Sequence, residues 1–406
     1  MTTATATKRV ISKEDIHLKA RLLSEGAKVT VNKPPATGFN PFRAMVINGS
    51  DLATLVRQEP YTRLEVQVNG DELEFFDCGK HLASGRMQEW FSWRDGKLSN
   101  GRPVNAAVIG MNQDIINIHY SYSCDNNNTG KSCKFCFFFA DQHVGVGKEL
   151  AKMPLGKIKE LAKEQAEAVK IATDAGWRGT LVVIGGLVDP SRRSQVADLV
   201  ELVMTPLREQ LSQEVFDELH ITANLYPPDD FKEMERWKAC GINSTEFDLE
   251  VTHPDYFKAI CPGKCATYPL EYWLEAQDAS VEIFGPGRGT TSFILMGLEP
   301  MNLMLEGVEE RMSKGVYPNM LVYQPVPGAD MFRMPPPNAD WLVEASEKIA
   351  DLYLKYEDRF DMPLAQDHRP GYTRMGRSQY IILAGDELAR RLQEQGNELP
   401  EAYPVC

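Results

Sequence analysis

Three closely spaced cysteines are the strongest chemical signal in the sequence. Cys124, Cys133 and Cys136 follow the pattern C-x8-C-x2-C. Three thiolates on one loop fit an iron–sulfur cluster with one iron left open, because a cubane cluster normally takes four cysteines. They also fit part of a zinc site, which a fourth ligand such as His119 or His143 would close. The spacing alone leaves both metals open.

A second group of cysteines raises the question of a second cluster. Cys240, Cys261 and Cys265 lie further along the chain, the last two as a C-x3-C pair. A stable second cluster would usually need a fourth thiolate, which only Cys78 or Cys406 could supply over a long distance in sequence. We therefore expect one cluster only.

The composition is that of a globular protein. Of the 406 residues, 43% are hydrophobic and 25% are charged, and the formal net charge is −13. This negative charge disfavours a broad nucleic-acid-binding face. The longest strongly apolar run, 180–188, is too short to span a membrane. Because the first residues lack the apolar core of a secretory signal, we expect a cytoplasmic protein.

The first part of the chain predicts a small α+β extension. A short helix is expected from Ser12 to Leu23, and residues 62–76 read as strand, Asn-Gly turn and strand, which is a hairpin pattern. Residues 1–112 show no chemistry of their own. We assign them to an N-terminal extension, and residues 361–406 to a C-terminal tail with a helix.

Residues 113–360 alternate between strand and helix patterns, which indicates parallel β-α-β units. The predicted fold class is therefore α/β, a partial (β/α)6 TIM-type barrel. The expected strands are 115–120, 180–184, 218–223, 244–250, 290–296 and 319–324, and the expected helices are 154–173, 191–213, 229–239, 269–284, 301–314 and 339–356.

Candidate functional groups fall at or just after the ends of the predicted strands, where such sheets carry their chemistry. They are Cys124, Gly185, Gly186, Asn224, Glu250, Gly297 and Gln324. The cysteine loop, residues 124–136, follows the first strand of the barrel directly.

In this arrangement the chain resembles the radical S-adenosylmethionine (SAM) superfamily. That family places three cysteines after the first strand of a partial barrel, usually as C-x3-C-x2-C with an aromatic residue before the last one. Phe135 matches the aromatic residue, whereas the first spacing of eight residues departs from the pattern. The segment Glu250–Pro254 is similar to the Glu-x-x-x-Pro of the biotin synthase and [FeFe]-hydrogenase maturase branch.

The resemblance implies a [4Fe-4S] cluster on the three loop cysteines, whose open iron binds SAM. Reductive cleavage of SAM then yields a 5′-deoxyadenosyl radical that abstracts hydrogen from a substrate. It also implies that Gly185 and Gly186, at the place of the family's Gly-Gly-Glu motif, present backbone carbonyls to SAM, although Leu187 replaces the acid. Glu250 would contact the SAM ribose.

Four further residues have both a functional and a structural interpretation. Asn224 could contact SAM or substrate, or only its own backbone. Arg288 could neutralise a carboxylate, or lie in a solvated loop. Tyr226 and His253 follow strands and are candidate catalytic residues on the substrate side.

The sequence thus predicts an oxygen-sensitive radical SAM enzyme that acts on a small molecule or cofactor precursor. The expected reaction is a rearrangement, C–C or C–S bond formation, or methylation, with reduced ferredoxin or flavodoxin as electron donor. The alternative is a non-enzymatic binding protein stabilised by zinc, which the three loop cysteines and one histidine would hold.

Overall fold

The computed structural model describes residues 10–35, 45–88, 92–111, 115–121, 124–136, 154–361, 364 and 381–398. Its N-terminal part combines one helix with one sheet. Helix α1 (Lys13–Glu25) begins at a capping box in which Ser12 and Asp15 satisfy each other's backbone N–H groups. The six-stranded sheet has the order β1-β4-β5-β6-β2-β3. The strands are β1 (Lys28–Lys33), β2 (Met45–Ile47), β3 (Leu52–Thr54), β4 (Leu64–Asn69), β5 (Glu72–Asp77) and β6 (Lys80–Met87). The predicted hairpin is confirmed as β4 and β5.

The second sheet has seven strands in the order β13-β12-β11-β10-β9-β8-β7. Strands β8 to β13 run parallel to one another, and β7 pairs antiparallel with β8. They are β7 (Ile109–Met111), β8 (Ile115–His119), β9 (Thr180–Ile184), β10 (His220–Asn224), β11 (Ser244–Glu246), β12 (Gly287–Met296) and β13 (Val316–Val322). Strand β7 lies before the predicted domain boundary at residue 112, yet it belongs to this second sheet. The N-terminal extension therefore contributes a strand to the second sheet.

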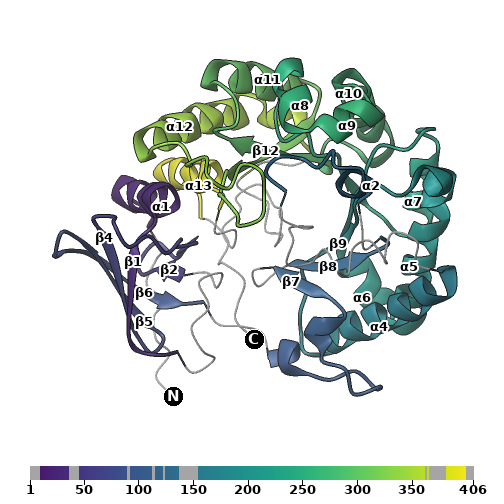
Figure 1. The fold of residues 1–406 in the computed structure, drawn as a ribbon, viewed down its shortest axis with the longest axis horizontal. Coiled ribbons are helices and arrows are strands. Elements are labelled where there is room, and N and C mark those ends of the chain that lie inside the picture. Colours follow the sequence, from purple (N-terminus) through teal and green to yellow (C-terminus); the bar gives the residue numbers. More distant parts are fainter. Residues whose placement is uncertain are drawn as a thin grey trace.

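Helices cover the outer face of the curled second sheet (Figure 1). They follow the strands in turn as α4 (Leu155–Asp174), α5 (Val196–Gln210), α6 (Gln213–Glu218), α7 (Glu233–Ala239), α8 (Pro254–Ile260), α9 (Pro262–Thr267), α10 (Leu270–Phe284), α11 (Met301–Ser313) and α12 (Ala339–Lys355). Strands with both faces buried, such as β13, lie between these helices and the interior of the curl. The mixed α/β fold is confirmed.

Several predicted boundaries are wrong. The expected helix 191–213 is a 3-10 helix, η3 (Pro190–Gln195), followed by α5 and then by α6, because extended backbone at Leu211 ends α5 and Ser212 caps α6. The expected strand 244–250 is only β11 plus one isolated bridge from Glu250 to Ile294. Helices α8 and α9 were not expected, because each is short and begins at a proline, which in sequence also fits a turn.

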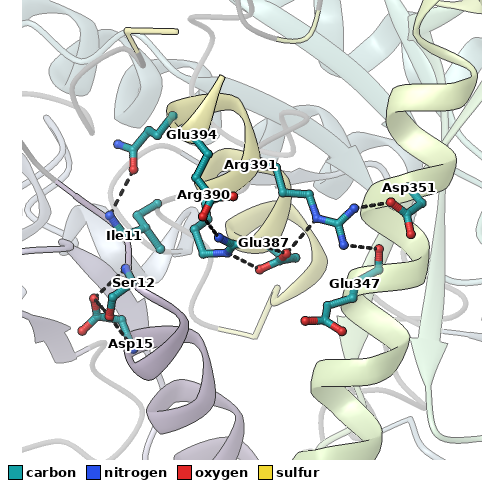
Figure 2. A network of polar contacts seen from close by, with 10 residues as sticks. Ile11, Ser12, Asp15, Glu347, Asp351, Glu387, Arg390, Arg391 and Glu394 are labelled. Carbon is teal, nitrogen blue, oxygen red and sulfur yellow. Dashed lines mark hydrogen bonds and ion pairs between the residues drawn. The ribbon is translucent and has the colours of Figure 1, made fainter. Parts of the chain in front are cut away.

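The C-terminal helix α13 (Ala384–Glu394) returns to the N-terminal helix. Lys19 on α1 and Asp386 on α13 form an ion pair of 2.6 Å in which both side chains are fully buried. Figure 2 shows the continuation of this contact, where Arg390 and Arg391 both bond Glu387, and Arg391 also bonds Asp351 on α12. The two ends of the described chain are therefore fastened to α12. No helix in the described ranges is long and apolar enough to cross a bilayer.

Candidate active site at the carboxyl edge of the sheet

The cysteine loop is held from three sides by backbone hydrogen bonds. The N–H of Asp125 donates to the carbonyl of Leu187 after β9 (2.7 Å), and the N–H of Lys134 donates to the carbonyl of Ile260 at the end of α8 (2.8 Å). On the third side the N–H of Met331 donates to the carbonyl of Lys134 (2.9 Å). The loop therefore lies across the carboxyl edge of the sheet, as the sequence predicts.

Helix α9 packs against this loop without a gap. A Cβ atom built on Gly263 would lie well under 3.0 Å from the side chain of Asn126 and from the carbonyl oxygen of Lys131. Only a glycine lets the backbone of α9 come this close to the loop. Phe135, the predicted aromatic residue of the motif, packs against the hydrophobic core from the same loop.

The thiols of this region differ in their ionisation. Burial raises the pKa of Cys124, and hydrogen bonds from backbone N–H groups partly offset this rise. In contrast, a hydrogen bond with Cys261 lowers the pKa of Cys133 to about 7. Lys264 lowers it further, and burial acts against both. The charge of Cys133 also raises the pKa of Cys124. No three His, Cys, Asp or Glu side chains of the described ranges form a preorganised metal-binding group.

The two histidines considered as a fourth ligand differ in what can be said of them. His119 is the last residue of β8 and is buried, and burial lowers its pKa to about 4. Its backbone bonds both ways with Gln165 on α4. His143 and Cys406 lie outside the described residues.

Gly185 and Gly186, for which the sequence predicts backbone contacts to SAM, follow β9 and lie against Tyr120. A Cβ atom on Gly185 would lie 2.5 Å from the Tyr120 ring. The carbonyl of Gly186 accepts a hydrogen bond of 3.1 Å from the Tyr120 hydroxyl. The glycines therefore place this tyrosine beside the cysteine loop.

Three acidic side chains follow one another at the end of β11. Glu246 ends β11 and Asp248 follows two residues later, and the side-chain amide of Asn224 donates to both carboxyl groups at 2.8 Å. Asn319 donates a further bond to Glu246. Burial raises the pKa of both carboxyl groups, and Asp248 raises that of Glu246 further. Asn224 thus bridges two carboxyl groups, a contact that sequence reasoning missed.

Glu250 is paired with a buried lysine. The Nζ of Lys264 on α9 donates to the Glu250 carboxylate at 2.7 Å and to the Asp248 carbonyl at 2.7 Å, and it lies 4.6 Å from the centre of the Trp273 ring. Burial raises the pKa of Glu250, and the ammonium group of Lys264 opposes this shift by favouring the carboxylate. With φ of 61°, Glu250 also adopts the left-handed backbone region, which is unusual for a non-glycine residue. Lys264 was missed because α9 was not expected.

The predicted catalytic candidates separate. The Tyr226 hydroxyl accepts a bond of 2.8 Å from Asn126 of the cysteine loop, and burial and the nearby thiols raise its pKa well above the usual value. The ring of His253 instead caps α8, accepting a bond from the N–H of Asp255. Tyr226 therefore contacts the cysteine loop, whereas His253 contacts the first turn of α8.

Arg288 and Cys240 lie at the opposite edge of the sheet. Arg288 is near the start of β12, where it forms an ion pair of 2.7 Å with Asp361. Cys240 ends α7 ahead of β11 and bonds the Trp237 carbonyl. Cys261 and Cys265, by contrast, follow β11 in the chain. The structure therefore does not bring Arg288 or Cys240 to the cysteine loop.

Comparison with known proteins gives one strong similarity. The chain is 90% identical over 401 residues to the bacteriochlorophyllide c C-7(1)-hydroxylase of Chlorobaculum limnaeum, covering 99% of this chain and all of that protein. No protein-family model matches the sequence.

Two solved structures are more distantly similar, each at 14% identity and a TM-score of 0.41. One is methylornithine synthase, with 77% of this chain and 92% of that chain covered. The other is a radical SAM methyltransferase from Sphaerobacter thermophilus, with 75% and 76% covered.

Proposed function

The chain belongs to the radical SAM enzymes, in the family of the bacteriochlorophyllide c C-7(1)-hydroxylase, and on this premise we propose that it hydroxylates a bacteriochlorophyllide at the C-7(1) carbon. The observation that carries the proposal is the 90% identity over nearly the whole chain. The non-enzymatic zinc alternative is wrong, because the chain is an enzyme. Hydroxylation is also not among the reaction types that the sequence predicted.

The donor set of the cysteine loop fits an iron–sulfur cluster. Cys124, Cys133 and Cys136 would hold it, and their loop is fastened to α8, to the turn after β9 and to Met331. When bound, a [4Fe-4S] cluster and SAM supply a 5′-deoxyadenosyl radical. The protein's part is to position the substrate carbon and to exclude O2 while admitting one water, which would supply the hydroxyl oxygen. The net reaction would turn the C–H bond and this water into a C–OH group as SAM is converted to methionine and 5′-deoxyadenosine with release of a proton.

The residues after β11 suit the polar part of SAM. Glu250 presents a carboxylate that can accept bonds from ribose hydroxyls, and Lys264 holds that carboxylate in place by an ion pair. Asn224 and Asp248 complete a polar wall on the same edge. We propose that Glu250 contacts the ribose and that Lys264 and Asn224 orient the carboxyl groups around it.

Two further features belong to the proposal. The parallel strands β8 to β13 and their covering helices would form a partial (β/α)6 barrel around SAM and substrate. Reduced ferredoxin or flavodoxin would deliver the electron that SAM cleavage requires.

The test is an anaerobic assay with bacteriochlorophyllide c that carries deuterium at C-7(1). The expected result is about four irons per chain, deuterium in the 5′-deoxyadenosine formed, and a product heavier by one oxygen atom at that carbon. Iron-loaded protein that forms 5′-deoxyadenosine without deuterium and leaves the pigment unchanged would overturn the substrate assignment. Colourless protein with one zinc would overturn the cluster.

A further inference from the structure

The junction between α8 and α9 brings a fourth thiol to the cysteine loop. Cys261 is at once the residue that ends α8 and the residue that caps the start of α9, and its side chain is fully buried. Its thiol forms a hydrogen bond with the thiol of Cys133. Sequence reasoning weighed Cys261 for a second cluster, whereas in the structure it contacts one of the three cysteines of the loop.

Backbone hydrogen bonds fix the position of Cys261 on both sides. Its N–H donates to the Phe257 carbonyl at 2.8 Å, and its carbonyl accepts from the N–H of Cys265 at 3.0 Å. The preceding residue, Ile260, accepts the bond of 2.8 Å from the N–H of Lys134 in the loop. The contact between the two sulfur atoms therefore depends on backbone that is bonded to both helices and to the loop.

In this pair Cys261 is the hydrogen-bond donor once a cluster is bound. A cysteine coordinates iron as a thiolate, so the sulfur of Cys133 then has no proton to donate. Cys261 has a weak S–H donor, and a thiol that is buried in this way keeps its proton. The Cys261 proton is therefore shared with a sulfur that would coordinate the cluster.

The nearby lysine acts on the same sulfur in a different way. The Nζ of Lys264 donates to the Glu250 carboxylate and to the Asp248 carbonyl, both at 2.7 Å. Lys264 acts on Cys133 through its charge, which the carboxylate of Glu250 partly offsets. Cys261 instead bonds the sulfur directly, so the two effects can be separated by mutation.

From this contact we propose that Cys261 is a positioning residue of the cluster site, which donates an S–H hydrogen bond to the Cys133 sulfur and raises the reduction potential of the cluster. The inference rests on the proposed function, because it requires the cluster that the three loop cysteines would hold. The reduced cluster carries one more negative charge than the oxidised one, so a hydrogen bond to a ligand sulfur stabilises the reduced form more. Cys261 thus favours uptake of the electron that SAM cleavage requires.

The test is an anaerobic redox titration of the reconstituted protein without SAM, followed by electron paramagnetic resonance of the reduced cluster. Cys261→Ala removes the donor and leaves a small apolar side chain. At a fixed potential its ratio of reduced to oxidised cluster should be about tenfold below that of the wild type, the lower end of what a hydrogen bond to a charged group is worth. This ratio corresponds to a midpoint about 59 mV more negative. The iron content should stay at about four per chain.

Two further variants separate the hydrogen bond from packing. Cys261→Ser restores a donor at the same place, so its midpoint should lie between those of Cys261→Ala and the wild type. Cys240→Ala is the control, because it removes a half-buried thiol at the opposite edge of the sheet. It should leave both the midpoint and the iron content unchanged.

Three results would overturn the proposal. A wild-type midpoint in Cys261→Ala would show that no such bond acts on the cluster. The same low midpoint in Cys261→Ala and Cys261→Ser would assign the shift to packing. Iron well below four per chain in Cys261→Ala would make Cys261 a ligand or a support of the loop. If the iron-loaded wild type leaves the pigment unchanged, the proposed substrate fails, whereas the midpoints still decide the role of Cys261.

Discussion

Replacing Gly263 by alanine tests whether α9 positions the cysteine loop. The added methyl group would meet the Asn126 side chain and the carbonyl oxygen of Lys131, both well under 3.0 Å. The carbonyl belongs to the backbone of the loop, so a side-chain rotation cannot relieve the contact. Because the loop is held by only a few backbone hydrogen bonds to its surroundings, we expect it to move away from α9.

Gly156→Ala provides the matched control. Gly156 is the second residue of α4, as Gly263 is of α9, and a Cβ atom there meets nothing within 4 Å. Both substitutions should stabilise their helices by the same gain in helix propensity, which is about 0.5–1 kcal/mol of unfolding free energy. The difference in unfolding free energy between the two variants is therefore the overpacking cost at Gly263, about 1–3 kcal/mol.

The assay has two parts, denaturant unfolding of both variants and iron content after anaerobic reconstitution. Gly156→Ala should unfold at or slightly above the wild-type denaturant concentration and bind the full complement of iron. Gly263→Ala should unfold earlier and bind several-fold less iron while keeping wild-type helical circular dichroism. Equal stability of the two variants, together with wild-type iron content in Gly263→Ala, would refute the reasoning.

Four other outcomes are expected. Alanine at any one of the three loop cysteines should abolish 5′-deoxyadenosine formation with the fold retained, and near wild-type formation would exclude the cluster assignment. Glu250→Ala should weaken SAM binding by about 1–3 kcal/mol in a titration, with an unchanged cluster spectrum; unaltered affinity would remove its ribose role. Serine at Cys240, Cys261 and Cys265 together should leave about four irons per chain, and a fall from eight to four would reveal a second cluster. Burial lowers the pKa of His220 from 6.5 to about 4. The contribution of the neutral, buried His220 to the free energy of unfolding is therefore fully present above pH 6.5 and is lost as the pH falls toward 4. That loss is about 3 kcal/mol, and His220→Asn should flatten this part of a pH–stability curve; an unchanged slope would contradict it.

Local signals in the sequence predicted many of the elements, although not all of them and not all of their boundaries. The hairpin of β4 and β5 follows from an Asn-Gly turn between alternating residues, and α4 from its apolar face. The cysteine loop was predicted at the end of β8 because its thiols directly follow an apolar strand. These features depend on neighbours a few residues away, so the chain encodes them locally.

Contacts between distant segments were decided by the tertiary structure alone. Lys264 meets Glu250 because α9 folds back over the end of β11, and Asn224 bridges two carboxyl groups because β10 and β11 pair in one register. Neither contact has a signature in the local pattern.

The roles of individual residues also required the three-dimensional structure. Equal sequence evidence supported Tyr226 and His253, yet the first bonds the cysteine loop and the second caps a helix. Arg288 was predicted for the site and lies at the other end of its strand, where it pairs with Asp361. The sequence by itself thus determined the class of enzyme and the order of many of its strands and helices. Which side chains face one another depends on the direction and register of strands far apart in the chain, and only the folded sheet sets these.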